Sequence, residues 1–282
     1  MSVFGLVMHR ERAETLAIDA IEWLTSRGHE VRLVTQEANA LERSELGLPP
    51  EKLAIGADLV LSLGGDGTML RSVELAAREG VPVLGVNLGQ LGYLTEVEPA
   101  GLRMALKRFL SGSYTLEERL RIQVVTTRKG GEVEQHDALN EVVIEKSQMG
   151  RTVRLEVELD GRLFTTYVCD GLILATPTGS TAYAFSVRGP IIDPRHRAIL
   201  MAPVAAHMLF DRSLVLQPDC SITVRVTGDR SAGVSVDGRT GAALLPGDSV
   251  ACTASEHPAQ FVTFGGQDFH SVLREKFGLT PL

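Results

Sequence analysis

The sequence predicts an α/β domain followed by a mainly antiparallel β domain. In the first part of the chain, apolar runs alternate with helix-like stretches, which is the pattern of a parallel sheet covered by helices. One of these runs, Leu59–Leu63, is continuously apolar, as expected of a strand buried on both faces. The pattern changes near Tyr114–Leu120, and from there to about Ser255 short alternating runs are separated by turn signals.

The elements of the first domain follow from hydrophobic spacing. The first helix is expected because Leu16, Ala20, Ile21 and Leu24 recur at helical intervals and Gly28 is a stop signal. We expect strands at Val3–Met8, Glu30–Thr35, Leu59–Leu63 and Val81–Val86, helices at Glu11–Ser26 and Met69–Glu79, and a loop at Leu41–Lys52.

The second domain is expected to consist mainly of strands. Two of them precede Asp-Gly pairs, at Asp160-Gly161 and Asp237-Gly238, which favour tight hairpin turns. We expect strands at Arg121–Thr127, Val153–Leu159, Ser221–Thr227 and Val234–Val236, one helix at Arg195–Met208, and a further amphipathic helix in the tail at Gln267–Phe277. The expected division is an α/β domain at 1–117, a β-rich domain at 118–255 and a C-terminal tail at 256–282.

Composition narrows the classes of protein. The net charge of −7 gives no electrostatic reason to expect nucleic acid or an anionic membrane as partner. No apolar stretch is long enough to span a bilayer, and the apolar run near the N-terminus is too short for a signal peptide. Three widely spaced cysteines, Cys169, Cys220 and Cys252, favour buried, reduced thiols and a cytoplasmic protein.

The string Gly64-Gly65-Asp66-Gly67-Thr68 follows the apolar strand Leu59–Leu63. Glycines after a strand let backbone N–H groups approach a phosphate, but the carboxylate of Asp66 repels such an anion. Asp66 either caps the following helix, acts as a general base, or holds Mg²⁺ beside phosphate. A P-loop is excluded because no Gly-Lys-Ser/Thr is present.

Three further stretches carry candidate chemistry. The glycine-rich run Gly85–Glu96 is either a plain turn or a neighbouring wall of the same site. Asn140-Glu141 opens an apolar strand, and these side chains either form a solvated turn or bind ribose hydroxyls. In Asp170–Ser186 an apolar strand runs into Thr176-Pro-Thr-Gly-Ser-Thr181, whose hydroxyls suggest an anion-binding turn rather than a plain surface turn. Tyr183 and Phe185 follow as a candidate wall for a base.

Taken together, these stretches make the chain resemble the NAD kinase family, which makes NADP from NAD and ATP. The Gly-Gly-Asp-Gly-Thr string is shared with lipid kinases, whereas Thr-Pro-Thr-Gly-Ser-Thr-Ala-Tyr is more specific to NAD kinases. The resemblance implies a tail that returns to the first domain, use of Mg²⁺ with ATP or another phosphoryl donor, and a homo-oligomer, dimer or tetramer. It implies that Asp66 is the general base for the adenosine ribose 2′-hydroxyl of NAD. It also implies a set of residues that contact nucleotide: Asp66, Gly67, Arg71, Asn140, Glu141, Arg151, Asp170, Thr181, Ala182, Tyr183, Ala184, Phe185, Ser186 and Ala205.

The sequence departs from the family pattern after Ser186, where Arg188 stands in place of a glycine; its side chain either points to solvent or touches phosphate. Two rival functions share part of the pattern. A lipid kinase would need an apolar entrance, which the sequence does not show, and a non-catalytic NAD(H) sensor would not need Asp66. Because Asp66 and Asn140 fall in different expected domains, we expect the site to lie in a cleft between domains.

Overall fold

The computed structural model describes residues 1–89, 92–241, 243–266 and 268–279. The chain folds into two compact units. The first contains Met1–Glu118 together with the segment that begins at Ala259, and the second is Arg119–Pro258. We expected the domains to change after residues 117 and 255, and the units change after residues 118 and 258.

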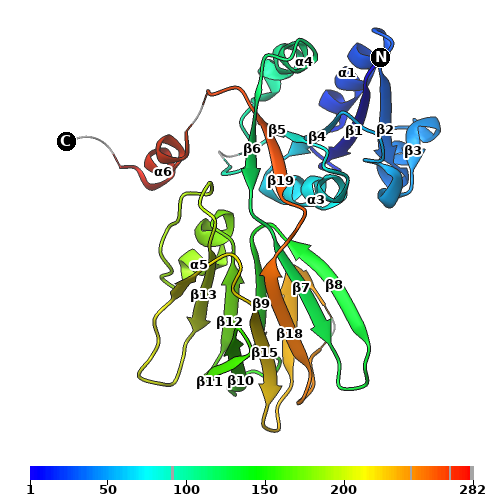
Figure 1. Ribbon diagram of the computed structural model, residues 1–282. Coiled ribbons are helices and arrows are strands. Elements are labelled where there is room, and N and C mark those ends of the chain that lie inside the picture. Colours follow the sequence, from blue (N-terminus) through cyan, green and yellow to red (C-terminus); the bar gives the residue numbers. More distant parts are fainter. Residues whose placement is uncertain (90–91, 242, 267, 280–282) are drawn as a thin grey trace. The chain divides into compact units, whose positions relative to one another are not determined.

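The first unit is built on a seven-stranded sheet in the order β3-β2-β1-β4-β5-β19-β6 (Figure 1). The pairings from β3 across to β19 are parallel. Its strands are β1 (Val3–Met8), β2 (Glu30–Val34), β3 (Gly47–Leu48), β4 (Leu59–Gly64), β5 (Val83–Asn87), β6 (Thr115–Arg119) and β19 (Ala259–Thr263). The strand order reverses between β1 and β4, and the carboxyl ends at such a reversal are where open α/β sheets bind ligands.

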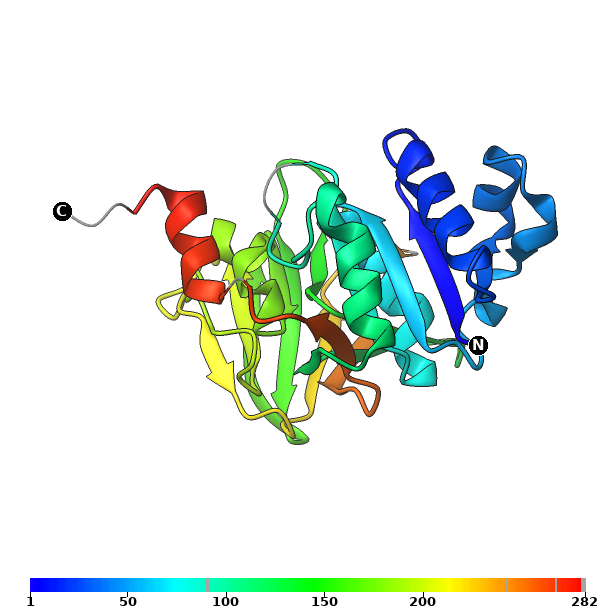
Figure 2. The same ribbon diagram turned by 90° about the horizontal axis from the view of Figure 1, so that it is seen from above.

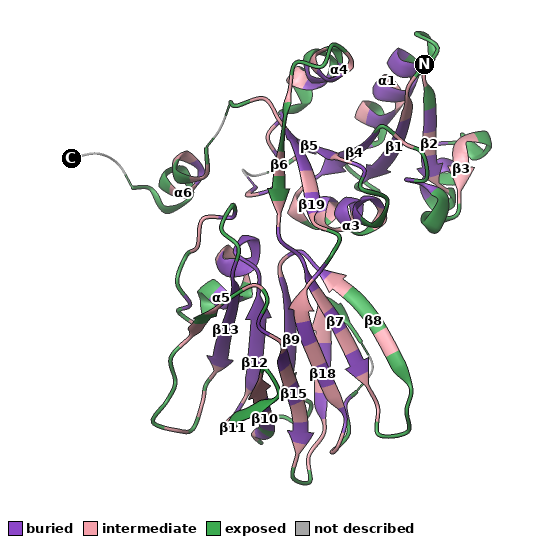
Figure 3. Cartoon of the chain, in the orientation of Figure 1, coloured by how far each residue is buried: buried purple, intermediate pink, exposed green. Residues whose placement is uncertain are grey.

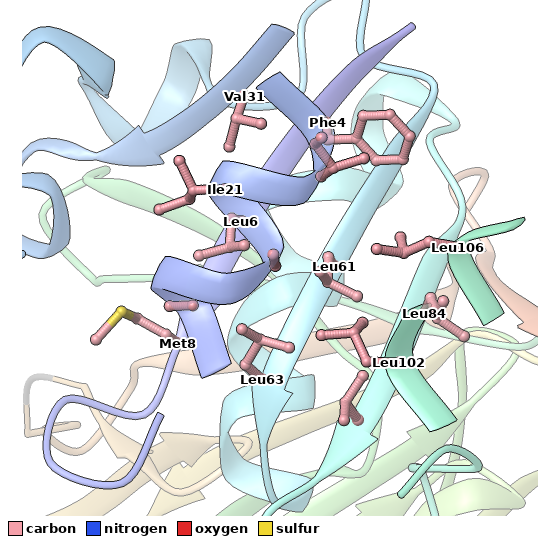
Figure 4. Close-up of a cluster of buried hydrophobic side chains, with 14 of the residues drawn as sticks. Phe4, Leu6, Met8, Ile21, Val31, Leu61, Leu63, Leu84, Leu102 and Leu106 are labelled. Carbon is pink, nitrogen blue, oxygen red and sulfur yellow. The ribbon is translucent and has the colours of Figure 1, made fainter. Parts of the chain in front are cut away.

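Helices α1 and α4 lie along one face of this sheet (Figure 2). Figure 4 shows Ile21 of α1 and Leu102 and Leu106 of α4 packed with Phe4 and Leu61 of the strands. The helices of the unit are α1 (Glu14–Thr25), α2 (Thr35–Ala40), α3 (Asp66–Ala76), α4 (Leu102–Leu110) and α6 (Phe269–Phe277), with short 3₁₀ turns at Ser44–Leu46, Pro50–Lys52, Ala77–Glu79 and Pro99–Gly101. A rigid apolar core therefore supports the strand ends that carry the glycine loop.

The C-terminal tail belongs to the first unit, as the fold class predicts. Strand β19 pairs in parallel with β5, and the Phe269 ring of α6 lies 6.5 Å from the Tyr93 ring. The Lys276 ammonium lies 4.3 Å above the same ring. The helix expected at Gln267–Phe277 is present at Phe269–Phe277, and Gln267 lies outside the described residues.

The second unit contains two antiparallel six-stranded sheets, in the orders β11-β10-β15-β18-β7-β8 and β14-β13-β12-β9-β16-β17. One core draws on both sheets, and a smaller one packs α5 on the outer face of β12 and β13. Strands β12 and β13 are therefore buried along nearly their whole length (Figure 3). The elements are β7 (Ile122–Thr127), β8 (Val133–Ala138), β9 (Glu141–Lys146), β10 (Val153–Leu159), β11 (Arg162–Cys169), β12 (Gly171–Ala175), a 3₁₀ turn η5 (Thr178–Thr181), α5 (Tyr183–Ser186), β13 (Ile199–Val204), β14 (Leu214–Leu216), β15 (Ile222–Thr227), β16 (Ala232–Val236), β17 (Arg239–Thr240) and β18 (Ser249–Ala254).

The helix expected at Arg195–Met208 is wrong, because this segment contains the strand β13 (Ile199–Val204). Because β13 is buried on both faces, its sequence is a continuous apolar run. It lacks the alternation of apolar and polar residues by which a half-buried strand is recognised. Pro203 is tolerated because β13 pairs at that point with β12, while its pairing with β14 covers only Ile199 to Met201.

Other boundaries also differ. The helix expected at Met69–Glu79 begins earlier, at Asp66, and ends in a 3₁₀ turn. The segment Leu41–Lys52, expected to be a loop, contains two 3₁₀ turns and the short strand β3, which pairs with β2. Helices α2 and α4 were not expected from the sequence.

Candidate active site

The glycine loop lies at the carboxyl end of β4. Gly65 is the N-cap residue of α3 and Asp66 is its first helical residue. An added Cβ at Gly64 would overlap the side chain of Thr68, so that glycine serves internal packing. An added Cβ at Gly65 or Gly67 would meet no atom within 4 Å. These two glycines therefore leave open space next to bare backbone, as a phosphate-binding loop requires.

The carboxylate of Asp66 is held by the loop after β5. The Tyr93 N–H donates to Oδ2 and the Leu94 N–H to Oδ1, each at 3.1 Å. Gly92 is needed beside them, because a Cβ there would collide with the Asp66 carboxylate. The N-cap position of α3 is Gly65, and no side chain caps the helix. The hypothesis that Asp66 serves as the helix cap is therefore wrong. Among the described residues, each oxygen accepts one N–H bond, from Tyr93 or Leu94, and a carboxylate oxygen has a further lone pair for a proton or a cation.

The loop at Gly85–Glu96 therefore does adjoin the glycine loop, as one of its two readings predicted. Gln90 and Leu91 lie outside the described residues. Farther along, Glu96 accepts hydrogen bonds from the Phe264 N–H at 3.0 Å and the Gly266 N–H at 3.1 Å. The loop that holds Asp66 is thus itself tied to the C-terminal segment.

Arg71, one turn along α3, forms an ion pair with Glu37 of α2. Glu37 is buried, and its other oxygen accepts the Met8 N–H from the end of β1 at 3.2 Å. A cavity of about 510 Å³ opens beside this pair, lined by Met8, Arg10, Gln36, Glu37, Asn39 and Ala40. The pair fixes a guanidinium group near the carboxyl ends of β1 and β4.

In the second unit, the backbone of the Asn140-Glu141 turn is hydrogen-bonded to the carboxylate of Asp237, which lies in the turn between β16 and β17. The Leu139 N–H donates to Oδ2 of Asp237 at 2.7 Å. The N–H groups of Asn140 and Glu141 donate to Oδ1 at 2.8 and 3.0 Å. The sequence marked Asp237 only as a turn residue, so its contact with this turn was missed.

The Thr176–Thr181 segment packs directly against Asn140. The Thr176 hydroxyl donates to the Leu139 carbonyl at 2.5 Å, and the Thr176 N–H donates to the Asn140 carbonyl at 2.8 Å. A Cβ at Gly179 would collide with the Asn140 backbone, so glycine is required there.

The hydroxyls of this segment largely serve the loop itself. Ser180 is fully buried, and its hydroxyl lies 2.6 Å from the Pro177 carbonyl and 3.0 Å from the Ile192 N–H. The hydroxyl of Thr181 donates to the Thr178 carbonyl. The expectation that these hydroxyls make an anion-binding turn is therefore wrong for Thr176 and Ser180, because buried hydroxyls satisfy their hydrogen bonds internally.

Glu141 is buried at the start of β9, with 8% of its surface exposed. Burial, and next the charge of Asp237, raises the pKa of Glu141 to about 7, while the N–H of Tyr183 opposes the rise. Its Oε2 is buried and has no hydrogen-bond partner among the described residues. A titratable group with an unused acceptor is typical of a ligand site.

Asp170 and Ala205 are neighbours at the paired ends of β12 and β13. Asp170 forms an ion pair with Lys146 at 2.8 Å, and its N–H donates to the Val204 carbonyl at 2.9 Å. Ala205, the next residue, has a left-handed backbone with φ +46°. Lys146 was not identified from the sequence, because a lone lysine in a strand carries no motif.

The short helix α5 presents two aromatic rings. Tyr183 and Phe185 are 37% and 39% exposed, while Ala184 between them is buried in the outer core. Ala182 is the N-cap residue of this helix, and Ser186 is its last residue.

Two further residues of the sequence motifs are exposed. Arg188, just beyond α5, is exposed and left-handed with φ +63°, which explains why a glycine suits that position. Arg151 is exposed in the connection between β9 and β10, and within the described part of the chain no hydrogen bond or ion pair joins it to the other candidate residues.

Within the described ranges, no group of three or more His, Cys, Asp or Glu side chains could hold a metal ion. The three cysteines are buried and free. None of the described helices has both the length and the apolar character needed to cross a membrane.

Comparisons with known proteins cover nearly the whole chain. The family model of the ATP-NAD kinase N-terminal domain matches residues 4–114, and that of the C-terminal domain matches residues 139–264. An NAD kinase of Citrifermentans bemidjiense is 38% identical over 280 residues, covering 98% of this chain and 97% of the relative. One of Moorella thermoacetica is 38% identical over 279 residues, covering 98% of this chain and 89% of that one.

Two solved structures are similar in fold. Yeast NADH kinase, complexed with NADH, has a TM-score of 0.89 at 24% identity, with 100% of this chain and 89% of that chain covered. An NAD kinase from Archaeoglobus fulgidus, in complex with ATP, has a TM-score of 0.74 at 26% identity, with 98% of this chain and 97% of that chain covered.

Proposed function

Because this chain belongs to the NAD kinase family, and is therefore a phosphotransferase with an alcohol acceptor, we propose that it phosphorylates the adenosine ribose 2′-hydroxyl of NAD with ATP and Mg²⁺. The product is NADP. The observation that carries this proposal is the Asp66 carboxylate, fixed by two N–H groups beside open glycine backbone.

In this proposal Asp66 is the general base. In the proposed reaction the 2′-hydroxyl oxygen bonds to the γ-phosphorus of ATP, and the bond from that phosphorus to the β–γ bridging oxygen breaks. The hydroxyl proton passes to Asp66. Phosphoryl transfer depends mainly on positioning and charge stabilisation, so a carboxylate held in one orientation suits the step.

The donor fits the first unit. Open space at Gly65 and Gly67 suits a phosphate chain. Arg71, one turn along the same helix and held by Glu37, is a candidate for a further contact to phosphate. Mg²⁺ is usually bound by one or two carboxylates and by substrate phosphates rather than by an all-protein cage. With Asp66 as the base, the ATP phosphates would be the main ligands of Mg²⁺. When bound, Mg²⁺ neutralises phosphate charge and offsets repulsion from Asp66.

NAD fits the second unit. Asn140 supplies both donors and acceptors, and ionised Glu141 accepts only, which matches a ribose diol. Asp170 and the Thr181–Ser186 segment supply further contacts, with the rings of Tyr183 and Phe185 available to a base. We also propose a homo-oligomer, a dimer or tetramer, working in the cytoplasm, which sedimentation and cell fractionation would test.

The test is direct. Purified protein incubated with ATP, Mg²⁺ and NAD should form NADP. Asp66→Asn should fold and bind NAD but lose about 10²–10⁴-fold in turnover, the usual worth of a general base. A control is Asp58→Asn, because Asp58 precedes β4 at its opposite end and its carboxylate likewise accepts a backbone N–H, from Val3 at 2.8 Å, whereas Asp66 accepts two. Near-normal turnover by Asp66→Asn would refute the assignment.

A further inference from the structure

The carboxylate of Asp237 accepts hydrogen bonds from three successive backbone N–H groups, those of Leu139, Asn140 and Glu141. The donors are separated from Asp237 by 96 to 98 positions in the sequence. Three such bonds to one ionised group define the position and tilt of the turn, because bonds to charged acceptors are short and about twice as strong as neutral ones.

An Asp-Gly turn does not by itself require an aspartate whose carboxylate accepts three backbone N–H groups. Asp160 occupies the equivalent place in a second Asp-Gly turn, with φ +51° against +48° for Asp237. Asp160 is exposed, and its side chain accepts one backbone N–H, from Ser221 at 2.9 Å. The two residues share backbone conformation, so what distinguishes Asp237 is the turn that it holds.

The surroundings of Asp237 also affect Glu141. Burial raises the pKa of Asp237, and the three N–H groups and the Arg121 charge oppose that rise. Asp237 in turn is the second cause, after burial, of the raised pKa of Glu141, with the Tyr183 N–H opposing it. Arg121 is itself buried, with Asp137 at 3.8 Å.

We propose that Asp237 is a positioning residue for NAD: its carboxylate sets the backbone of Leu139–Glu141 so that the side chains of Asn140 and Glu141 meet the ribose together. This rests on the proposed function, and it assigns Asp237 no contact with the reacting atoms. The residue acts through the turn, and its negative charge adds to the effect of burial in raising the pH at which Glu141 ionises.

The experiment compares Asp237→Asn with Asp160→Asn by calorimetric titration of NAD and, separately, of ATP. Asparagine tolerates the left-handed backbone and keeps one acceptor oxygen, so the turn should still form. Asp237→Asn should raise the Kd for NAD about tenfold, since it weakens charge-assisted bonds at a ligand-binding turn. The Kd for ATP should stay unchanged, and so should both constants in Asp160→Asn.

A pH profile separates positioning from loss of structure. In wild type the affinity for NAD should fall as the pH drops through about 7, where Glu141 takes up a proton. In Asp237→Asn the midpoint should move to lower pH, because the repelling charge is gone, and in Glu141→Gln the transition should vanish. Asp237→Gly, which adopts the left-handed backbone without strain and removes the charge, should show the same shift and provides a second variant if the asparagine variant does not fold.

Each outcome is decisive. If wild type binds NAD but neither Asp237 variant changes the NAD affinity or the midpoint, the positioning role is overturned while the proposed function stands. Equal weakening of NAD and ATP would mean general structural damage and would also overturn it. If wild type binds no NAD, both proposals are overturned.

Discussion

Replacing Glu141 with glutamine should stabilise the second unit at alkaline pH while weakening NAD binding. Glu141 is buried beside Asp237, and its pKa is raised from 4.5 to about 7. Glutamine has nearly the same shape, keeps an oxygen for the Tyr183 N–H and carries no charge. The variant therefore removes the cost of ionising a buried carboxyl without opening a cavity.

The magnitude follows from the difference in pKa. Each tenfold change in a protonation equilibrium is worth about 1.4 kcal/mol, so the rise corresponds to about 3 kcal/mol at most. Because the folded state binds the proton more tightly than the unfolded chain, wild-type stability should fall as the pH rises from about 4.5 to about 7. The advantage of Glu141→Gln over wild type should accordingly grow by about 3 kcal/mol across that window.

The assay must report on the second unit. The single tryptophan, Trp23, lies in the first unit, so its fluorescence does not serve. Hydrogen exchange of the β9 peptide amides, followed by mass spectrometry at pH 5 and pH 8 with intrinsic exchange rates corrected for pH, gives the free energy of opening. Glu145→Gln, at an exposed position on the same strand, is the matched control: it keeps Glu141, so its stability relative to wild type should not change between the two pH values. A Glu141→Gln advantage that is equal at both pH values would refute the reasoning.

Three other substitutions test the site. Asn140→Ala should weaken NAD binding far more than ATP binding in separate titrations, and equal losses would contradict the assignment of the two ligands. Gly179→Ala should destabilise the second unit by about 1–3 kcal/mol in urea unfolding, because the new Cβ meets backbone that cannot yield, whereas Gly130→Ala has open space and should not. Arg188→Gly should raise the melting temperature, because relief of a left-handed backbone is worth about 1 kcal/mol, and should leave NAD affinity unchanged if the side chain points to solvent. A loss of NAD affinity in that variant would indicate contact with phosphate.

Local backbone chemistry made much of the fold readable from the sequence. The strands Val3–Met8 and Val153–Leu159 lie where the apolar pattern predicts them, and a half-buried strand such as Val153–Leu159 is recognisable by its alternation. The Gly64–Thr68 loop was located by its glycines. The same reasoning failed at Arg195–Met208, because a strand buried on both faces loses the alternation that distinguishes it from a helix.

The sequence by itself determined the α/β and antiparallel β architecture and the residue types available for chemistry, since turn preferences and hydrophobic periods act over a few neighbouring residues. Only the tertiary structure decided which contacts those residues make. The Asp66 carboxylate is held by N–H groups 27 and 28 positions away rather than capping its own helix. Asp237 holds a turn almost a hundred positions distant, and the Ser180 hydroxyl faces inward. Hydrogen bonding and burial depend on which distant segments the fold brings together, so the orientation and ionisation of a side chain are set by neighbours that local sequence does not specify.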